Sequence, residues 1–377
     1  MSAPAPPSQP SDRLRAALLG VEEANVLEGS MRGLCADLVE ENPFYAPYAL
    51  LPAIKAYGDE HLRLACVWSG EDLIGVWPVQ KQRFYARLPL RYWSSWTHAH
   101  CYFAAPLLRR GWEPQALKEL YSLLCKGDEA RSFVRFNRIE RDGDIYAAVM
   151  SSAKQQRRLC YEAGAVARAM LQSGASAEAT LAVHVKKKKR KELARLRNRL
   201  DEQGAVQFRE FAPGDDLAEW TDAFLALEDR GWKGAQSTSM KSNPVDAQWF
   251  RDTLAGAQAA GALHFLRLDL DGRPLAMLVT LMSKGAAYSL KICHDPEFDR
   301  YSPGVMIEIE AMRSLLERAD FRFADSCATP DHSMINGLWR ARRVVTGLNV
   351  SGRGLFSRAG LMLAKSLEGA RARFPKG

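Results

Sequence analysis

The sequence predicts an α+β protein built from two similarly constructed units. The chain has 377 residues, and at about 150 residues per domain this length suits two domains. Hydrophobic residues make up 47% and charged residues 25%, as in ordinary globular proteins. Two stretches, 62–80 and 263–282, each have the pattern strand, turn, strand, and Gly75 then lies opposite Ala276, 201 positions later. This faint repeat favours two α+β units over one continuous sheet.

The elements of the first unit follow from short-range patterns. Apolar runs at 62–68 and 73–80 flank a Ser-Gly-Glu-Asp turn, which predicts a hairpin. Apolar residues at helical spacing predict a helix at 113–125, and alternation predicts a strand at 132–139. The stretch 164–180, rich in Ala, Ser and Gly, is only weakly patterned.

The second unit is patterned more clearly, with an Asp-Gly hairpin turn at 271–272 between two apolar strands. The predicted strands are 206–211, 263–270, 275–283, 286–294, 321–326 and 344–351. The predicted helices are 186–200, 217–230, 244–261, 304–319, 334–342 and 355–373. The polar segments 93–102 and 232–243 are expected to be loops that contact the acceptor substrate.

The positive charge is confined to one segment. The net charge is +8, and Lys186–Arg199 alone contributes +8 from nine basic residues and one acidic residue, so the rest of the chain balances to zero. This argues against DNA as a partner, because proteins that coat nucleic acid spread charge over a whole face. Leu193, Leu196 and Leu200 form an apolar stripe along the same helix. Its basic face either meets water only, or attracts a polyanionic ligand, or contacts anionic lipid headgroups.

Cysteine usage and the N-terminus indicate the compartment. Seven cysteines without a CxxC pair suggest neither a disulfide framework nor a zinc site, so no metal is expected and a reducing, cytoplasmic location is favoured. Peripheral contact with the inner membrane is compatible with this location. No apolar stretch reaches the roughly 18–20 residues of a membrane span. Pro and Ser dominate the start, and residues 1–20 are expected to form a flexible leader.

Several catalytic signatures are absent. No GxxxxGK[ST], GxGxxG after a strand, HExxH or GxSxG pattern occurs, which leaves kinase, dehydrogenase, metalloprotease and α/β-hydrolase readings without support. His98 and His100 would share one strand face, beside Cys101. Because the sequence offers no evident further ligands, we expect packing or substrate-pocket roles for these histidines rather than metal binding.

The most informative segment runs from a strand ending at His294 to a helix opened by Ser302-Pro303-Gly304. Backbone N–H groups at a helix N-terminus bind anions, and Gly lets a phosphate approach the backbone. The alternative is an ordinary capped helix, with Ser as N-cap and Pro at the first helical position.

The order of elements from 263 onward resembles the GNAT acyltransferase superfamily. The closer resemblance is to the GNAT-like family of the CelD type, for cellulose or exopolysaccharide synthesis, which is related to the FemAB aminoacyl transferases. The matching pieces are NPFY at 42–45, the basic helix at 186–200, KICHDPEFDRYSPGVM at 291–306 and DSCATPDHSMINGLW at 325–339. Arg300 to Val305 keep part of the usual Gln/Arg-x-x-Gly-x-Gly/Ala loop.

This resemblance implies tandem GNAT-like units, each a mixed central sheet flanked by helices. Residues 21–180 would form an N-terminal unit that is structural or binds the acceptor. Residues 181–352 would form the donor-binding and catalytic unit, followed by a basic helical tail at 353–377.

The resemblance also implies acyl-CoA, in the first place acetyl-CoA, as co-substrate. The implied donor contacts are Lys291, Ile292, Ser302, Pro303, Gly304 and Val305. Transfer to an amine needs a base, for which Asp325 is the first candidate and His332 the second, and an acid for the leaving thiolate, for which Tyr301 is a candidate with Tyr288. Each of these could equally be a cap or turn residue.

The resulting prediction is an N-acyltransferase that acts on an amine. The acceptor would be a small molecule, a saccharide or a lipid-linked intermediate of envelope or exopolysaccharide synthesis. One alternative is a FemAB-like transferase that uses aminoacyl-tRNA. Another is a non-catalytic accessory protein of polysaccharide synthesis.

Overall fold

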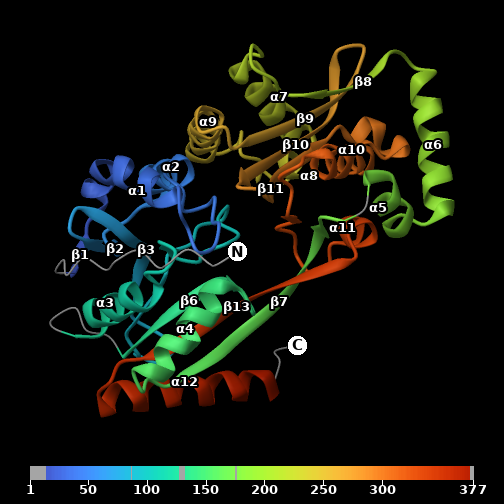
Figure 1. Cartoon of the computed structure of the whole chain (residues 1–377). Coiled ribbons are helices and arrows are strands. Elements are labelled where there is room, and N and C mark those ends of the chain that lie inside the picture. Colours follow the sequence, from blue (N-terminus) through green and yellow to red (C-terminus); the bar gives the residue numbers. More distant parts are fainter. Residues whose placement is uncertain (1–13, 86, 127–131, 175, 374–377) are drawn as a thin grey trace, which may run out of the picture.

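One mixed sheet of 13 strands crosses the computed structural model, with helices on both of its faces (Figure 1). The structure describes residues 14–85, 87–126, 132–174 and 176–373. The strand order is β1-β2-β3-β4-β6-β13-β7-β12-β11-β10-β9-β8, with the short β5 paired to β3. The α+β class predicted from the sequence is confirmed.

The first half of the sheet is built by the N-terminal part of the chain. Its strands are β1 (Leu14–Leu19), β2 (Leu62–Ser69), β3 (Asp72–Gln82), β4 (Tyr92–Ser95), β5 (Leu107–Leu108), β6 (Phe133–Glu140) and β7 (Cys160–Gln172). Its helices are the 3-10 helix η1 (Val21–Leu27), then α1 (Glu28–Cys35), α2 (Pro47–Tyr57), α3 (Glu113–Cys125) and α4 (Asp144–Gln155).

The second half has a similar order of elements from β8 to β13, with α5 and α6 before it and α12 after it. Its strands are β8 (Val206–Glu210), β9 (Leu263–Leu270), β10 (Arg273–Ser283), β11 (Ala286–His294), β12 (Phe323–Asp325) and β13 (Ala341–Ser351). Its helices are α5 (Ala177–His184), α6 (Lys187–Asp201), α7 (Leu217–Arg230), α8 (Trp232–Ala235), α9 (Pro244–Ala259), the 3-10 helix η2 (Pro296–Tyr301), α10 (Pro303–Glu317), α11 (Ser333–Leu338) and α12 (Leu355–Arg373).

The internal repeat predicted from the two hairpins is present in the structure. β2 and β3 have the same lengths as β9 and β10, and adding 201 to their bounds gives those of β9 and β10. Each half also contains one parallel pair, β4 with β6 and β11 with β12. The two halves are therefore built alike, as tandem GNAT-like units are.

The halves exchange their last strands. β7 follows α4 along the chain but pairs with β12 of the second half, and β13 follows α11 but pairs with β6 of the first. β7 and β13 also pair with each other along their length and join the two halves into one sheet. The division proposed between residues 180 and 181 falls within α5.

Three expectations from the sequence need correction. The repeat favoured two units over one continuous sheet, but the strands of both halves form a single sheet, because β7 and β13 pair with each other. Residues 14–19, expected to belong to a flexible leader, form β1, which pairs antiparallel with β2 and closes that edge of the sheet. The remainder of the proposed leader, 1–13, lies outside the described residues. The weakly patterned stretch that begins at 164 is mostly strand β7, in which Ala and Gly are held by neighbours on both sides.

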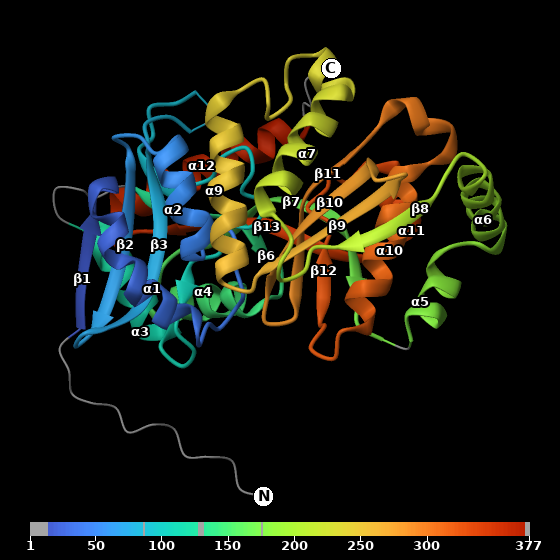
Figure 2. The ribbon, with the colours of Figure 1, turned by 90° about the horizontal axis from the view of Figure 1, so that it is seen from above.

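The two halves also meet through helices. α2 and α9, which precede equivalent strands, pack against each other at the junction (Figure 2). Gly256 of α9 makes this approach possible, because a Cβ there would lie 3.0 Å from the Cβ of Tyr48 in α2. The main hydrophobic core includes residues of both halves, such as Leu64, Trp77, Phe250 and Leu281.

Candidate functional site

The fourth strand of the second half, β11, is irregular in two ways. It pairs with β12 only over Ala286–Tyr288, although it continues to His294. Beyond Tyr288, no strand of the described residues pairs with this edge of β11. In the pairing with β10, Ser289 lies opposite Thr280 and Lys291 opposite Val279, so Leu290 is an extra residue in a β-bulge. The backbone of 289–293 therefore presents N–H and C=O groups that the sheet does not use on that side.

The loop after β11 leads into the N-terminus of α10. η2 ends at Ser302, whose φ of 56° and ψ of 50° turn the chain into α10, with Pro303 at its start. Ser302 makes no side-chain capping hydrogen bond, so the ordinary Ser-capped helix is not what forms. The N–H groups of Val305 and Met306 donate to the Ser302 carbonyl at 3.1 Å.

Gly304 lies against the end of β11. A Cβ at Gly304 would lie 3.3 Å from Nδ1 of His294, whose Nε2 lies 2.8 Å from Oδ1 of Asp299. The half-exposed His294 ring therefore covers the first turn of α10. At this place the positive end of the α10 dipole lies next to Gly304 and the His294 imidazole. This combination suits an anionic group.

Lys291 is the half-buried cation of β11. Burial and the neighbouring Lys233 of α8 together lower its pKa to about 8, against the opposing effects of Glu228 and Asp246. A fraction of the Lys291 side chain is therefore a neutral amine near neutral pH, able to accept a proton.

Lys291 lies close enough to His98 and His100 to influence their charge. These histidines belong to a group of rings, here called the ring cluster: Tyr57, His98, His100 and Trp249. His98 stacks on Tyr57 with ring centroids 4.8 Å apart, and His100 stacks on Trp249 at 4.4 Å. Burial, together with nearby positive charge that includes Lys291, lowers the pKa of both histidines to about 3. Both imidazoles are therefore neutral at physiological pH.

The ring cluster has unused hydrogen-bonding capacity. Asp246 accepts a hydrogen bond from the Tyr57 hydroxyl at 2.7 Å, but its Oδ1 lies 3.7 Å from Nε2 of His100. Both ring nitrogens of His100 and Nε1 of Trp249 are buried and have no hydrogen-bond partner. Because unpartnered buried polar groups are costly, the cluster is suited to bind a polar ligand.

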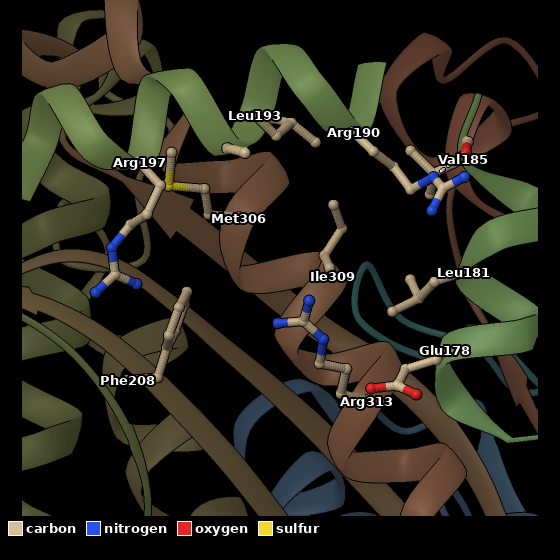
Figure 3. Close-up of a pocket in the computed structure, with 11 residues that line it drawn as sticks. Glu178, Leu181, Val185, Arg190, Leu193, Arg197, Phe208, Met306, Ile309 and Arg313 are labelled. Carbon is tan, nitrogen blue, oxygen red and sulfur yellow. Dashed lines mark hydrogen bonds between the residues drawn. The ribbon is translucent and has the colours of Figure 1, made fainter. Parts of the chain in front are cut away.

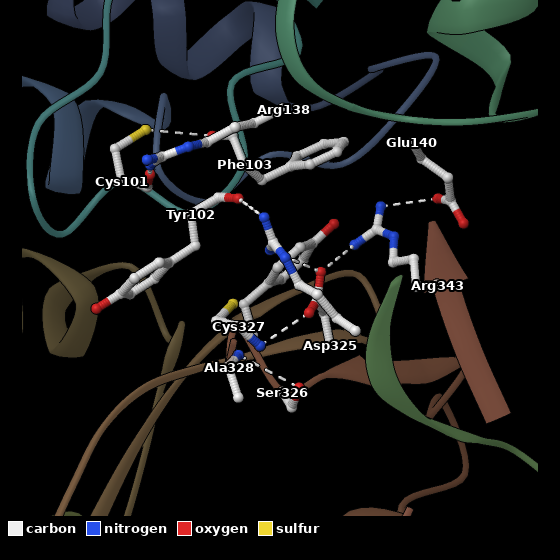
Figure 4. A network of polar contacts seen from close by, with 12 residues as sticks. Cys101, Tyr102, Phe103, Arg138, Glu140, Asp325, Ser326, Cys327, Ala328 and Arg343 are labelled. Carbon is white, nitrogen blue, oxygen red and sulfur yellow. Dashed lines mark hydrogen bonds and ion pairs between the residues drawn. The ribbon is translucent and has the colours of Figure 1, made fainter. Parts of the chain in front are cut away.

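The first candidate base, Asp325, lies in a buried ionic network instead (Figure 4). Its Oδ2 lies 3.3 Å from Nη1 of Arg168 and 3.2 Å from Nη1 of Arg343, and its Oδ1 accepts from the Cys327 N–H at 2.8 Å. Arg343 also donates to Glu140 at 2.8 Å. The Asp325 carboxylate therefore links β12 to Arg168 of β7 and Arg343 of β13.

The other two catalytic candidates lie apart from Asp325. His332 is the exposed N-cap of α11, where its Nδ1 accepts from the Ile335 N–H at 3.5 Å. Tyr301 is buried in the apolar cluster beneath α6, with the Arg300 guanidinium 4.8 Å from its ring. No hydrogen bond or ion pair within the described ranges joins any two of Asp325, His332 and Tyr301.

The basic helix α6 covers a cavity of about 320 Å³ beside α10 (Figure 3). Its walls come from α5, α6, β8 and α10, with apolar side chains such as Leu193, Phe208 and Ile309 and the guanidinium groups of Arg190, Arg197 and Arg313. Leu193, Leu196 and Leu200 are buried as predicted, and α6 also contacts η2, which leads into Ser302.

Sequence reasoning missed part of this arrangement. It singled out His98, His100 and Lys291, but not Trp249 or Asp246 of α9, which only the packing of α9 against α2 brings to them. Arg168 was missed because β7 was not recognised as a strand. Arg343 was missed because the last strand was predicted to begin only at 344, whereas β13 begins at Ala341. In the part of the chain that the structure describes, no group of three or more His, Cys, Asp or Glu side chains could hold a metal ion.

Comparison with known proteins identifies the second half. Residues 187–331 match the family model described as Acetyltransferase (GNAT) domain, a stretch shorter than half of the chain. No curated protein matches the sequence.

Three solved structures share the fold over nearly the whole chain. FemX is 9% identical, with a TM-score of 0.57 over 94% of this chain and 100% of its own. The C-terminal domain of a protein from Agrobacterium fabrum, named as a lysylphosphatidylglycerol synthetase, is 13% identical, with a TM-score of 0.55 over 91% and 96%. A conserved protein of unknown function from Bacteroides thetaiotaomicron is 10% identical, with a TM-score of 0.52 over 90% and 100%.

Proposed function

Starting from a second half that is a GNAT-type acyltransferase domain, we propose that the protein transfers an acyl group from acyl-CoA to an amine bound at the junction of the halves. The observation that carries this proposal is the bulged strand β11. Its edge is unpaired beyond Tyr288, and its Lys291 lies close to the histidines of the ring cluster. Acetyl-CoA, the CelD-type family and a role in envelope or exopolysaccharide synthesis are finer parts of the same proposal.

The donor would bind with its phosphates at the N-terminus of α10. The dipole of α10 and the basic residues of α6 would supply positive potential there, and Gly304 would leave room for a phosphate next to the backbone. The cavity beneath α6 would take the nucleotide end, because it combines apolar walls with three guanidinium groups. The thioester would lie along the unpaired edge of β11, where a free N–H group of 289–293 can stabilise the developing oxyanion.

The reaction needs one proton acceptor and one proton donor. The acceptor amine attacks the thioester carbonyl, a C–N bond forms, and the C–S bond breaks. In this proposal the neutral fraction of Lys291 takes the proton of the attacking amine, directly or through one water. The same proton can then pass to the leaving thiolate. Asp325 would hold β7, β12 and β13 together, and would act on the reaction only through their position.

The ring cluster indicates what kind of amine would bind. Neutral rings with unpartnered nitrogens suit a ligand with hydroxyl groups and an apolar face, such as an amino sugar. The neutral state of both histidines also avoids repulsion of an incoming ammonium group.

The test combines binding and turnover. Calorimetric titration with acetyl-CoA and longer acyl-CoAs should show binding. Addition of an amino sugar should then lead to acyl transfer, which is measured as the appearance of the free CoA thiol. The absence of heat with any acyl-CoA would contradict the proposed donor. Binding without thiol release from any amine would instead favour the non-catalytic accessory protein.

Aminoacyl-tRNA is the second candidate donor, and the exposed lysines of α6 favour it. Lys186, Lys187, Lys188 and Lys191 are all exposed on one short stretch. Binding of tRNA that weakens steeply with salt, and that is lost in Lys187→Glu/Lys188→Glu, would support this donor. Indifference to tRNA would leave acyl-CoA as the donor.

A further inference from the structure

The C-terminal helix α12 carries an apolar stripe on its outer side. Leu355 and Phe356 are 82% and 94% exposed, and Met362 and Leu363 are 54% and 46% exposed. Residues seven apart lie on the same side of a helix, so these four side chains form one continuous stripe. The opposite side, with Leu361 and Ala364, packs on the sheet. α12 lies along the lower edge of the first half in Figure 1.

The neighbouring segment 83–91, of which residue 86 lies outside the described residues, packs beside α12. Leu90 packs with Leu361 and Ala364, and the Tyr85 hydroxyl donates a hydrogen bond to Glu368 of α12. Phe84 is 61% exposed and Leu88 is 37% exposed. Six of the eleven large apolar side chains that are exposed in the described ranges therefore lie on α12 and this segment. Such a concentration marks an interaction surface.

The exposed charged residues on this surface are basic. Arg358 and Lys365 are exposed along one edge of the α12 stripe, and Arg353 is exposed just before the helix. Arg83, Arg87 and Arg91 follow the same pattern on the neighbouring segment, where the first two are exposed beside Phe84 and Leu88. Neither 353–367 nor 83–91 contains an acidic residue. The first acidic residue of α12, Glu368, turns inward to Arg135 at 3.2 Å.

We propose that α12 and segment 83–91 dock on an anionic lipid bilayer, with the helix lying in the plane of the interface. An apolar stripe edged by Arg and Lys matches the boundary between acyl chains and anionic headgroups. A second copy of the chain fits less well. A two-fold contact would place the same basic edge of each copy close to its equivalent, with no acidic residue to compensate.

This surface is separate from the site proposed for acyl transfer. α12 packs on β6 and β7 of the first half and on β13, which pairs with them, whereas Lys291 and the α10 N-terminus lie elsewhere in the second half. The docking proposal therefore stands or falls independently of the proposed reaction. In the described part of the chain, no helix is both long enough and apolar enough to cross a membrane.

The experiment is co-sedimentation of the full chain with vesicles of phosphatidylcholine, with and without phosphatidylglycerol. The chain should sediment with the anionic vesicles, and less so at high salt. Phe356→Ser/Leu363→Ser should reduce binding at least tenfold, because it removes apolar side chains that already face solvent and so leaves the fold intact. Arg358→Glu/Lys365→Glu should abolish the preference for phosphatidylglycerol.

Two controls distinguish this surface from others. Val183 of α5 is 63% exposed away from α12, so Val183→Ser should bind as the wild type does. Lys187→Glu/Lys188→Glu tests whether α6 makes the membrane contact instead. The proposal is overturned if the wild type does not sediment with anionic vesicles, or if the α12 variants bind unchanged. It is also overturned if sedimentation velocity shows a dimer that Phe356→Ser dissociates.

Discussion

Arg343 of β13 and Asp325 of β12 form an ion pair at 3.2 Å in which neither side chain has any exposed area. Three aromatic rings surround the guanidinium of Arg343, those of Phe103, Tyr288 and Phe323, within 4.5 to 5.2 Å of its central carbon. The pair thus ties the end of the second half to the strand that crosses into the first.

Asp325→Asn tests whether this carboxylate is structural or catalytic. Removing one partner of a buried ion pair leaves the other charge uncompensated, so unfolding free energy should fall by about 3–5 kcal/mol. Urea denaturation measures the loss, with Asp331→Asn at an exposed position of the same loop as control. An Asp325→Asn protein of unchanged stability that has lost turnover would restore Asp325 as the base.

Lys291→Ala should remove the proton acceptor and lower turnover by about 100-fold or more, the usual contribution of a general base. In the wild type, kcat/KM for the acyl-CoA should rise with pH and level off above about 8, because only the neutral amine accepts a proton. This rise should disappear in Lys291→Ala. Lys284→Ala, on the turn of the same hairpin, should keep both rate and profile. A Lys291→Ala enzyme with the wild-type pH profile would remove Lys291 from the reaction.

Gly304→Glu should weaken acyl-CoA binding at least tenfold, because it brings a negative charge to the place proposed for the phosphates. Gly304→Ala is the matched control. Its Cβ would approach His294 to 3.3 Å, which tests crowding without charge. Calorimetry should therefore rank the wild type, Gly304→Ala and Gly304→Glu in order of falling affinity. Equal affinities of Gly304→Glu and the wild type would place the donor elsewhere.

Glu308 of α10 makes stability depend on pH. Burial raises the pKa of its carboxyl to about 8, from 4.5 for the free group, and its Oε2 has no hydrogen-bond partner. Between these values the folded state holds a proton that the unfolded state has lost, so stability falls as the pH rises through this range. Glu308→Gln should flatten this slope and gain about 1–3 kcal/mol at pH 8 by urea denaturation. Glu310→Gln, which changes a carboxyl paired with Arg313 on the same helix, should leave the slope as it is.

The fold could be predicted furthest where local patterns are strong. The hairpins at 62–80 and 263–282 have apolar strands and clear turns, and their repeat survives in the bounds of β2, β3, β9 and β10. β7 could not be recognised, because Ala and Gly have low strand propensity and only pairing with β12 and β13 holds them extended. β1 is an edge strand next to a polar, Pro-rich start, and its partner β2 lies about 45 residues later.

The candidate site could be predicted only in part. Residues 302–304, at the start of α10, are contiguous in the sequence, so the Ser-Pro-Gly turn could be recognised from the sequence alone. The surroundings of Asp325 are not local, because Arg168 is 157 positions away and its strand was unrecognised. Lys291 was expected to contact a donor phosphate. The structure surrounds it with groups from α7, α8, α9 and the loop after β4, which no spacing rule relates to β11.

The exchange of β7 and β13 also constrains how the chain is made. During synthesis, β6 has no partner on one side until residues 341–351 have left the ribosome, although every other strand of its half has long been complete. The N-terminal half must therefore wait, with an open sheet edge, for nearly the whole polypeptide to emerge. Neither half can be cut out at residue 180 as a self-sufficient piece, because each would lose the strand that the other contributes. A stop codon shortly before β13 would leave not one missing strand but two unfinished sheets.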